Sequence, residues 1–207
     1  VTYNPKGRIS LSQPDYIKNI LARFNMSDCK STATPASPGS QLSIATTQDE
    51  EKDNSEIPYK SAVGSLWYAS RGTRPDIEFA TNTVAQHASN FRLVHWQAVK
   101  RVFRYLSSCI TSSITYFPTG VIKIVAYSDS NWGANVDNRR SKTGYVLFVA
   151  GGAVVWQTKS QKSVALSSCE AEYYAMSEVI KEMLWLISLL HELKIKFDTP
   201  ILYVDNE

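Results

Sequence analysis

Apolar residues in the first half of the chain recur at the three-and-four spacing of amphipathic helices. Residues 7–26 predict a short strand, a turn at a proline and a short helix. Residues 31–58 are rich in Ser, Thr and Pro and then acidic, which predicts a linker or surface loop. Three further helical segments are predicted, at residues 59–71, 74–89 and 93–109.

After residue 120 the period shortens, and apolar runs bounded by turn residues predict strands. The first covers 121–130, and the next two, 143–151 and 153–158, are joined as a hairpin by a Gly-Gly pair. A long helix from residue 168 and a fourth strand at 200–205 follow. This order predicts an α+β or α/β fold of the βββαβ type, in which the fourth strand can pair in parallel with the first.

Two glutamates near the start of the long helix have different predicted environments. Ser167 and Glu170 fit a capping box, and Glu170 belongs to the polar face. Glu172 lies about 200° further around the helix, at the head of the apolar stripe. A carboxylate directed inward there needs a cation, a hydrogen-bond donor or a proton. The stripe is predicted to comprise Ala175, Met176, Val179, Ile180, Met183, Leu184, Ile187 and Leu190.

Asp129 and Asp205 end the two strands that are predicted to be neighbours, so they would lie side by side at one edge of the sheet. A helix crossing that sheet can bring Glu172 within reach of both. Three carboxylates this close repel one another unless a divalent cation lies between them. All-oxygen ligands favour Mg²⁺ or Mn²⁺, and two such ions about 3.5–4 Å apart can assist displacement at a phosphodiester.

The spacing alone leaves other interpretations of these three residues open. Asp129 and Asp205 are also consistent with turn formation at strand ends, where Asp is common. Glu172 is also consistent with a half-buried ion pair.

Composition adds an asymmetry of charge to this picture. The 207 residues carry a net charge of +3, but residues 79–169 hold ten basic and two acidic side chains, which leaves +8 there. Such a block suggests a polyanion such as nucleic acid, although an ordinary uneven surface fits equally well. The three cysteines are widely spaced, which suits a reducing compartment and fits no zinc pattern. No apolar run is long enough to predict a membrane span.

Stretches along nearly the whole chain resemble, in the same order, the Pol polyprotein of copia-type LTR retrotransposons. The stretches are "TRPDIEFATNTVAQHASNFRLVHWQAVKRVFRYL", "AYSDSNWG", "RRSKTGYV", "VALSSCEAEYYAMSE" and "VDNE". The resemblance implies that residues 1–30 are the end of a reverse transcriptase thumb-like region and that 31–58 are a linker or surface loop. It further implies that residues 59–118 are a helical connection-like region and that 119–207 are a ribonuclease H-like domain.

The resemblance also implies metal-binding and catalytic roles for Asp129, Glu172 and Asp205, with two Mg²⁺ or Mn²⁺ ions as cofactors. The family's fourth metal-binding carboxylate follows the "VDN" element, so we expect this chain to be C-terminally truncated and to lack the last elements of the domain. The catalytic aspartates of the polymerase lie in a domain upstream of this segment, so polymerisation is not expected of it.

The basic block supplies candidate contacts to the phosphates of a bound nucleic acid, which position a duplex without reading its sequence. The candidate nucleic-acid-binding residues are Arg139, Arg140, Lys142, Lys159, Lys162, Lys100 and Arg104. For Lys100 and Arg104 an alternative stays open, namely that they solvate the outer face of a helix whose other face is core.

We therefore expect the parent protein to hydrolyse the RNA strand of RNA–DNA hybrids, with the hybrid and other parts of the polyprotein as partners and no membrane. The resemblance implies a cytoplasmic location in a virus-like particle, with a nuclear stage. A catalytically incomplete nucleic-acid-binding module from a decayed element is the second hypothesis. An integrase-type nuclease is the third, and the "EAEY" helix and the "TRPD" block argue against it.

Overall fold

The computed structural model describes residues 1–4, 7–37, 39, 42–43, 56–118, 120–135 and 137–205. Contacts divide the chain into a helical unit, Ser12–Ser113, and a sheet unit, Val1–Leu11 with Ile114–Glu207. The boundaries predicted from composition and resemblance stay predictions. Within the described residues, no helix combines the length and the apolar character that crossing a bilayer requires.

The helical unit buries the apolar faces of its helices in one core. Its elements are α1 (Pro14–Arg23), α2 (Tyr59–Thr73), the 3-10 turn η1 (Pro75–Ile77), α3 (Glu78–Ala85) and α4 (Leu93–Ser108). Ile17, Leu66 and Phe103 are fully buried in this core. The predicted helices are thus confirmed, but α3 is shorter than its predicted segment 74–89, because η1 replaces the first turn and the helix already ends at Ala85.

A buried cation joins three elements of the helical unit. The Arg74 side chain is only 1% exposed, and its Nη2 lies 2.7 Å from Oδ2 of Asp76. Nη1 of Arg74 donates to the carbonyl of Cys109 at 3.0 Å, and the Tyr105 hydroxyl donates to Asp76 at 2.8 Å. Burial opposes ionisation of Asp76, but the hydrogen bonds and charge of Arg74 outweigh it and lower the pKa of Asp76.

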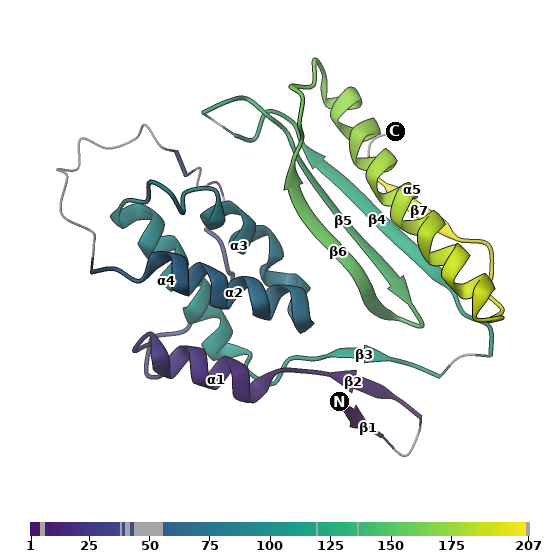
Figure 1. The fold of residues 1–207 in the computed structure, drawn as a ribbon, viewed down its shortest axis with the longest axis horizontal. Coiled ribbons are helices and arrows are strands. Elements are labelled where there is room, and N and C mark those ends of the chain that lie inside the picture. The colour runs from purple at the N-terminus through teal and green to yellow at the C-terminus, as the bar shows by residue number, and fades with distance from the viewer. Residues whose placement is uncertain are drawn as a thin grey trace. The chain divides into compact units, whose positions relative to one another are not determined.

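The sheet unit contains a four-stranded sheet in the order β6-β5-β4-β7 (Figure 1). Its strands are β4 (Ile124–Asn131), β5 (Lys142–Val149), β6 (Gly152–Ser160) and β7 (Ile201–Val204). β4, β5 and β6 are antiparallel, and β7 pairs in parallel with β4, as the element order predicts. Ala150 and Gly151 form the hairpin turn, and both have the positive φ that a tight turn of this kind requires. The prediction that Gly151 and Gly152 form the turn is therefore wrong by one residue, because Gly152 is the first residue of β6.

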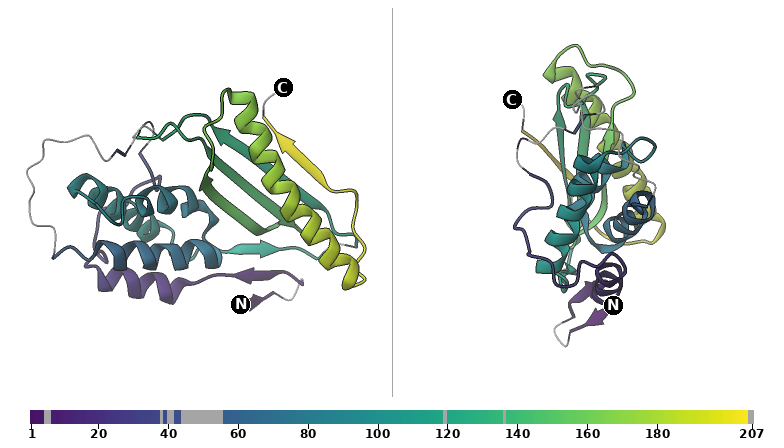
Figure 2. Two further views of the ribbon diagram at one scale, coloured as in Figure 1. Left: turned by 45° about the horizontal axis from the view of Figure 1, so that its top comes forward. Right: turned by 90° about the vertical axis from the view of Figure 1, so that its left-hand side faces the viewer.

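Helix α5 (Ser168–Glu192) lies across one face of this sheet, over β4 and β5 (Figures 1 and 2). Its buried residues are Ala171, Glu172, Ala175, Val179, Met183, Leu186 and Leu190. Ile180 and Leu184 are 41% and 59% exposed, so the prediction that they belong to the buried stripe is wrong. The reason is geometric, because the sheet covers a single line of helix positions about four residues apart.

A second, small sheet was not predicted. β1 (Thr2–Tyr3), β2 (Ile9–Leu11) and β3 (Ile114–Tyr116) pair in that order, which joins the first residues of the chain to a segment more than 100 positions later. The Tyr116 hydroxyl donates to the Ala153 carbonyl at 2.7 Å. A Cβ on Gly152 would lie only 2.5 Å from the Tyr116 ring, so this close approach requires glycine.

Replacing Asp76 by Asn should lower the free energy of unfolding by about 2 kcal/mol at pH 7, because the buried Arg74 guanidinium loses its charge partner. Since the pKa of Asp76 is lowered in the folded chain, its stabilisation is present above the unfolded pKa of about 3.9. This stabilisation is lost as pH falls through the folded pKa. The difference in free energy of unfolding between wild type and Asp76→Asn should therefore become smaller in acid.

Urea denaturation across this pH range measures the effect. Asp15→Asn is the matched control, because the Asp15 side chain is 91% exposed and lies 3.9 Å from Lys18. An equal loss in both variants would contradict a special role for the buried pair.

Candidate metal centre

The chain connections bring several elements to one end of the four-stranded sheet. β4 ends there at Asn131, and β7, which is parallel to β4, ends there at Val204. β6 is antiparallel to β5 and also ends there, so α5 begins at this end after a short connection. The ends of two strands and the first turn of α5 therefore converge.

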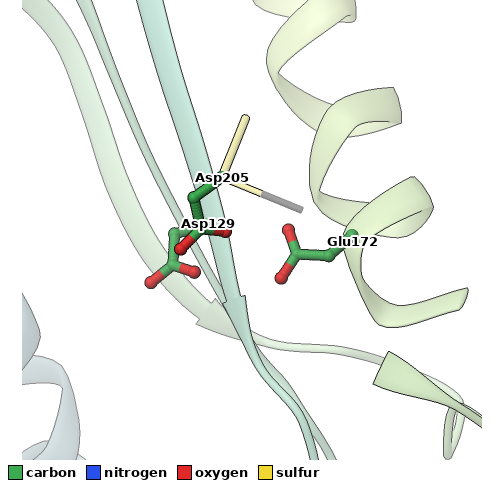
Figure 3. Close-up of side chains that lie close together, drawn as sticks. All are labelled: Asp129, Glu172 and Asp205. Atoms are coloured by element: carbon green, nitrogen blue, oxygen red, sulfur yellow. The ribbon is translucent and has the colours of Figure 1, made fainter. Parts of the chain in front are cut away.

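Asp129, Glu172 and Asp205 meet at this end of the sheet. Each offers a carboxylate oxygen, and the three oxygens lie within 4.8 Å of one another. Ser128 pairs with Val204, so Asp129 and Asp205 are the next residues along two adjacent parallel strands. Figure 3 shows Glu172 reaching from the first turn of α5 toward the two aspartates. The structure thus brings together the three carboxylates that the sequence singled out.

The three carboxylates differ in their environment. Asp129 and Asp205 are exposed, whereas Glu172 is only 8% exposed. Oε1 of Glu172 accepts hydrogen bonds from the backbone N–H of Ser130 at 3.1 Å and from its hydroxyl at 3.0 Å. Oε2 of Glu172 is buried and has no hydrogen-bond partner among the described residues. A buried carboxylate oxygen of this kind is costly unless a cation or proton compensates it.

Two anchors hold the segment around the first turn of α5 in place, and neither was predicted. The Gln161 side-chain amide donates to the Ala171 carbonyl at 2.9 Å and to the Thr143 hydroxyl at 3.0 Å. Nε1 of Trp132 donates to the Ala165 carbonyl at 3.0 Å, which ties the connection before α5 to the end of β4. A single sequence carries no signal for these pairings, because they join residues from different elements.

The helix cap is close to the prediction. Ser167 is the N-cap, and its hydroxyl accepts a hydrogen bond from the backbone N–H of Glu170 at 3.1 Å. The Glu170 carboxylate accepts from the N–H of Leu166 at 2.6 Å, one residue before the cap. Glu170 thus stabilises the start of α5, whereas the Glu172 side chain is directed toward Asp129 and Asp205.

The donor set and the geometry fit a divalent cation. Three carboxylates supply only oxygen ligands, and these ligands suit Mg²⁺ or Mn²⁺ better than zinc. Their mutual repulsion and the uncompensated Oε2 of Glu172 would both be relieved by a bound cation. The three residues could therefore hold a metal ion.

The predicted nucleic-acid contacts in the sheet unit have different surroundings. Arg139, Arg140 and Lys162 are exposed beyond the ends of β4 and β6. The Lys159 ammonium forms an ion pair with Glu178 of α5. Hydrogen bonds from Lys159 and from Lys181 lower the pKa of Glu178.

Lys142 differs from these residues because it is only 7% exposed. Burial lowers the pKa of Lys142 to about 8. Its ammonium is therefore not part of the exposed basic surface at this end of the sheet.

Lys100 and Arg104 lie on α4 in the helical unit, so the structure does not place them within the unit that holds the carboxylates. Nε of Arg104 donates to the Lys30 carbonyl at 2.6 Å, and Lys100 is half-buried. Arg104 therefore has a structural role inside the helical unit.

Comparisons with known proteins give relatives that match nearly the whole chain. It is 40% identical over 203 residues to the Retrovirus-related Pol polyprotein from transposon TNT 1-94 of Nicotiana tabacum, covering 97% of this chain and 15% of that protein. It is 37% identical over 199 residues to the Retrovirus-related Pol polyprotein from transposon RE1 of Arabidopsis thaliana, covering 96% and 13%. The chain thus spans about a seventh of these relatives.

A third relative is the Secreted RxLR effector protein 161 of Plasmopara viticola. It is 46% identical over 130 residues, which cover 63% of this chain and 92% of that protein. No family model matches the chain, and no solved structure matches it significantly.

Millimolar Mg²⁺ or Mn²⁺ should raise the melting temperature of the chain, because an ion that binds only the folded state stabilises it. At 100 times the dissociation constant the gain is about 2.7 kcal/mol. Asp129→Asn should remove most of this gain, and thermal denaturation with and without the ion measures it. Asp198→Asn, an exposed residue before β7, should keep the gain. A wild-type melting temperature that neither ion changes would argue against the centre.

Proposed function

We propose that this chain, which belongs to the copia-type retrovirus-related Pol polyproteins, carries the metal centre of a ribonuclease H-type nuclease. In the parent polyprotein this nuclease would hydrolyse the RNA strand of RNA–DNA hybrids. The observation that supports the proposal is the meeting of Asp129, Glu172 and Asp205 at one end of a βββαβ sheet. The pairing of β7 alongside β4 supports a ribonuclease H-like arrangement of this sheet.

The three carboxylates would share the work of holding the metal according to their exposure. Asp129 and Asp205 are open to solvent, so they can contact ions that also contact a bound phosphodiester. Glu172 accepts two hydrogen bonds from Ser130 and would supply a metal ligand from the protein interior. Two Mg²⁺ ions bound here would activate a water molecule and stabilise the leaving 3′ oxygen.

The exposed basic residues near the centre would position the hybrid. Arg139 and Arg140 lie in the connection between β4 and β5, and Lys162 follows β6, so all three lie at the end of the sheet that holds the carboxylates. Contacts from such side chains to phosphates set the register of a duplex without reading its sequence. Selection of RNA over DNA would come from contacts to 2′-hydroxyl groups and from groove shape.

Cleavage of a labelled RNA–DNA hybrid in Mg²⁺ tests the proposal directly. The parent polyprotein should cut the RNA strand, and Asp129→Asn in it should reduce the rate at least about 100-fold, because one metal ligand loses its charge. Asp198→Asn should cut at the wild-type rate.

Binding of the hybrid by the same polyprotein separates the proposal from its rival. Tight binding together with no cleavage in either Mg²⁺ or Mn²⁺ would favour a nucleic-acid-binding module without hydrolysis. Full cleavage by Asp129→Asn would refute the assignment of the centre.

The double variant Arg140→Ala, Lys162→Ala should bind the hybrid more weakly and with a salt dependence reduced by about one to two phosphate contacts. Fluorescence anisotropy at several salt concentrations measures both effects. The matched control is Lys123→Ala, Lys196→Ala, which removes the same charge at the opposite end of the sheet, before β4 and β7. Equal weakening by both double variants would indicate only a general effect of net charge.

A further inference from the structure

Ser130 has an unusual relation to the buried carboxylate of Glu172. Its backbone N–H and its hydroxyl both donate to the same oxygen, Oε1, at 3.1 and 3.0 Å. Ser130 lies on β4 and Glu172 lies on α5, so the two hydrogen bonds cross from the sheet to the helix. The two donors fix the position of one carboxylate oxygen and thereby restrict rotation of the whole group.

The other oxygen of the same carboxylate is left for a different partner. Oε2 of Glu172 is buried and accepts no hydrogen bond from the described residues, although the side chain is 92% removed from solvent. Fixing Oε1 by two protein donors therefore presents Oε2 in a defined direction, with no hydrogen-bond partner from the residues that the structure describes. An oxygen in this condition suits the role of a metal ligand, because an oxygen already engaged by a donor binds a cation less well.

We propose that Ser130 is a positioning residue for the metal centre, whose hydroxyl orients Glu172 so that Oε2 serves as the ligand. This inference rests on the proposed function, because it needs Glu172 to bind a metal ion. Partners of metal ligands typically change metal affinity about 10- to 100-fold when they are removed. The backbone N–H of Ser130 remains in any variant, so we expect the lower end of that range for loss of the hydroxyl.

The chain offers a matched control on the same strand. Ser128 lies two residues before Ser130 and therefore on the same, α5-facing side of β4. It is 5% exposed, and its hydroxyl has no hydrogen-bond partner within the described part of the chain. Ser128→Ala thus removes the same atom from the same face of the same strand without touching Glu172.

Titration of the full 207-residue chain with Mn²⁺, followed by the electron paramagnetic resonance signal of the free ion, tests the proposal. Ser130→Ala should weaken Mn²⁺ binding about tenfold, Ser128→Ala should leave it unchanged, and Ser130→Thr, which keeps the hydroxyl, should restore most of it. Equal Mn²⁺ affinity of wild type and Ser130→Ala would overturn the role of Ser130 while leaving the metal centre intact. Equal weakening by Ser128→Ala and Ser130→Ala would also overturn it, since packing of the strand would then explain both.

Metal-free melting curves separate a failure of this inference from a failure of the proposed function. Ser130→Ala should lower the melting temperature of the otherwise wild-type chain. It should lower it less in a chain that also carries Glu172→Ala, because the hydrogen bond is then already absent. If the two substitutions show this non-additive effect on the melting temperature but the wild-type chain does not bind Mn²⁺, the proposed metal centre would be refuted, and with it the positioning role of Ser130. Absence of coupling would show that the hydrogen bond itself does not form, and would overturn the inference whatever the metal result.

Discussion

The parallel pairing of β4 with β7 is the constraint on which the rest of the centre depends. A parallel neighbour cannot be reached by a tight turn, so the chain must cross the sheet, and α5 makes that crossing. The same connection delivers the first turn of α5 to the end of the sheet where β4 and β7 both finish. Asp129, Glu172 and Asp205 are far apart in sequence and meet because of this single topological requirement.

Placing Glu172 at this point has an energetic cost that the surrounding structure partly offsets. Its carboxylate is almost completely removed from water, and among the described residues only one of its oxygens receives hydrogen bonds. Gln161 holds the same turn of α5 through the Ala171 carbonyl, and Ser167 caps the helix one turn earlier. These hydrogen bonds hold the start of α5 in place, while one buried Glu172 oxygen has no hydrogen-bond partner among the described residues, an arrangement that suits a cation-binding site.

The charges of the chain divide between structural and exposed roles in a way that composition does not reveal. Arg74 is buried against Asp76, and Lys142 is buried in the sheet unit. Lys159 is paired with Glu178, and Arg104 binds a backbone carbonyl. The positive block of residues 79–169 thus contains three residues, Arg104, Lys142 and Lys159, that are buried or whose hydrogen-bonding capacity is already used inside the protein.

The sequence by itself determined the types and order of most elements, because apolar periodicity and turn residues act locally. It also singled out Glu172 over Glu170, since the helical period alone directs the two glutamates to different sides. The order of the elements also indicated the pairing of β7 with β4, but only the tertiary structure decided the other partners. The small sheet that joins β1 and β2 to β3, the exposure of Ile180 and Leu184, the burial of Lys142 and the hydrogen bonds of Ser130 to Glu172 all depend on which distant segments come together. Distances in space between such segments are set by packing of the whole chain, and no local pattern of residues encodes them.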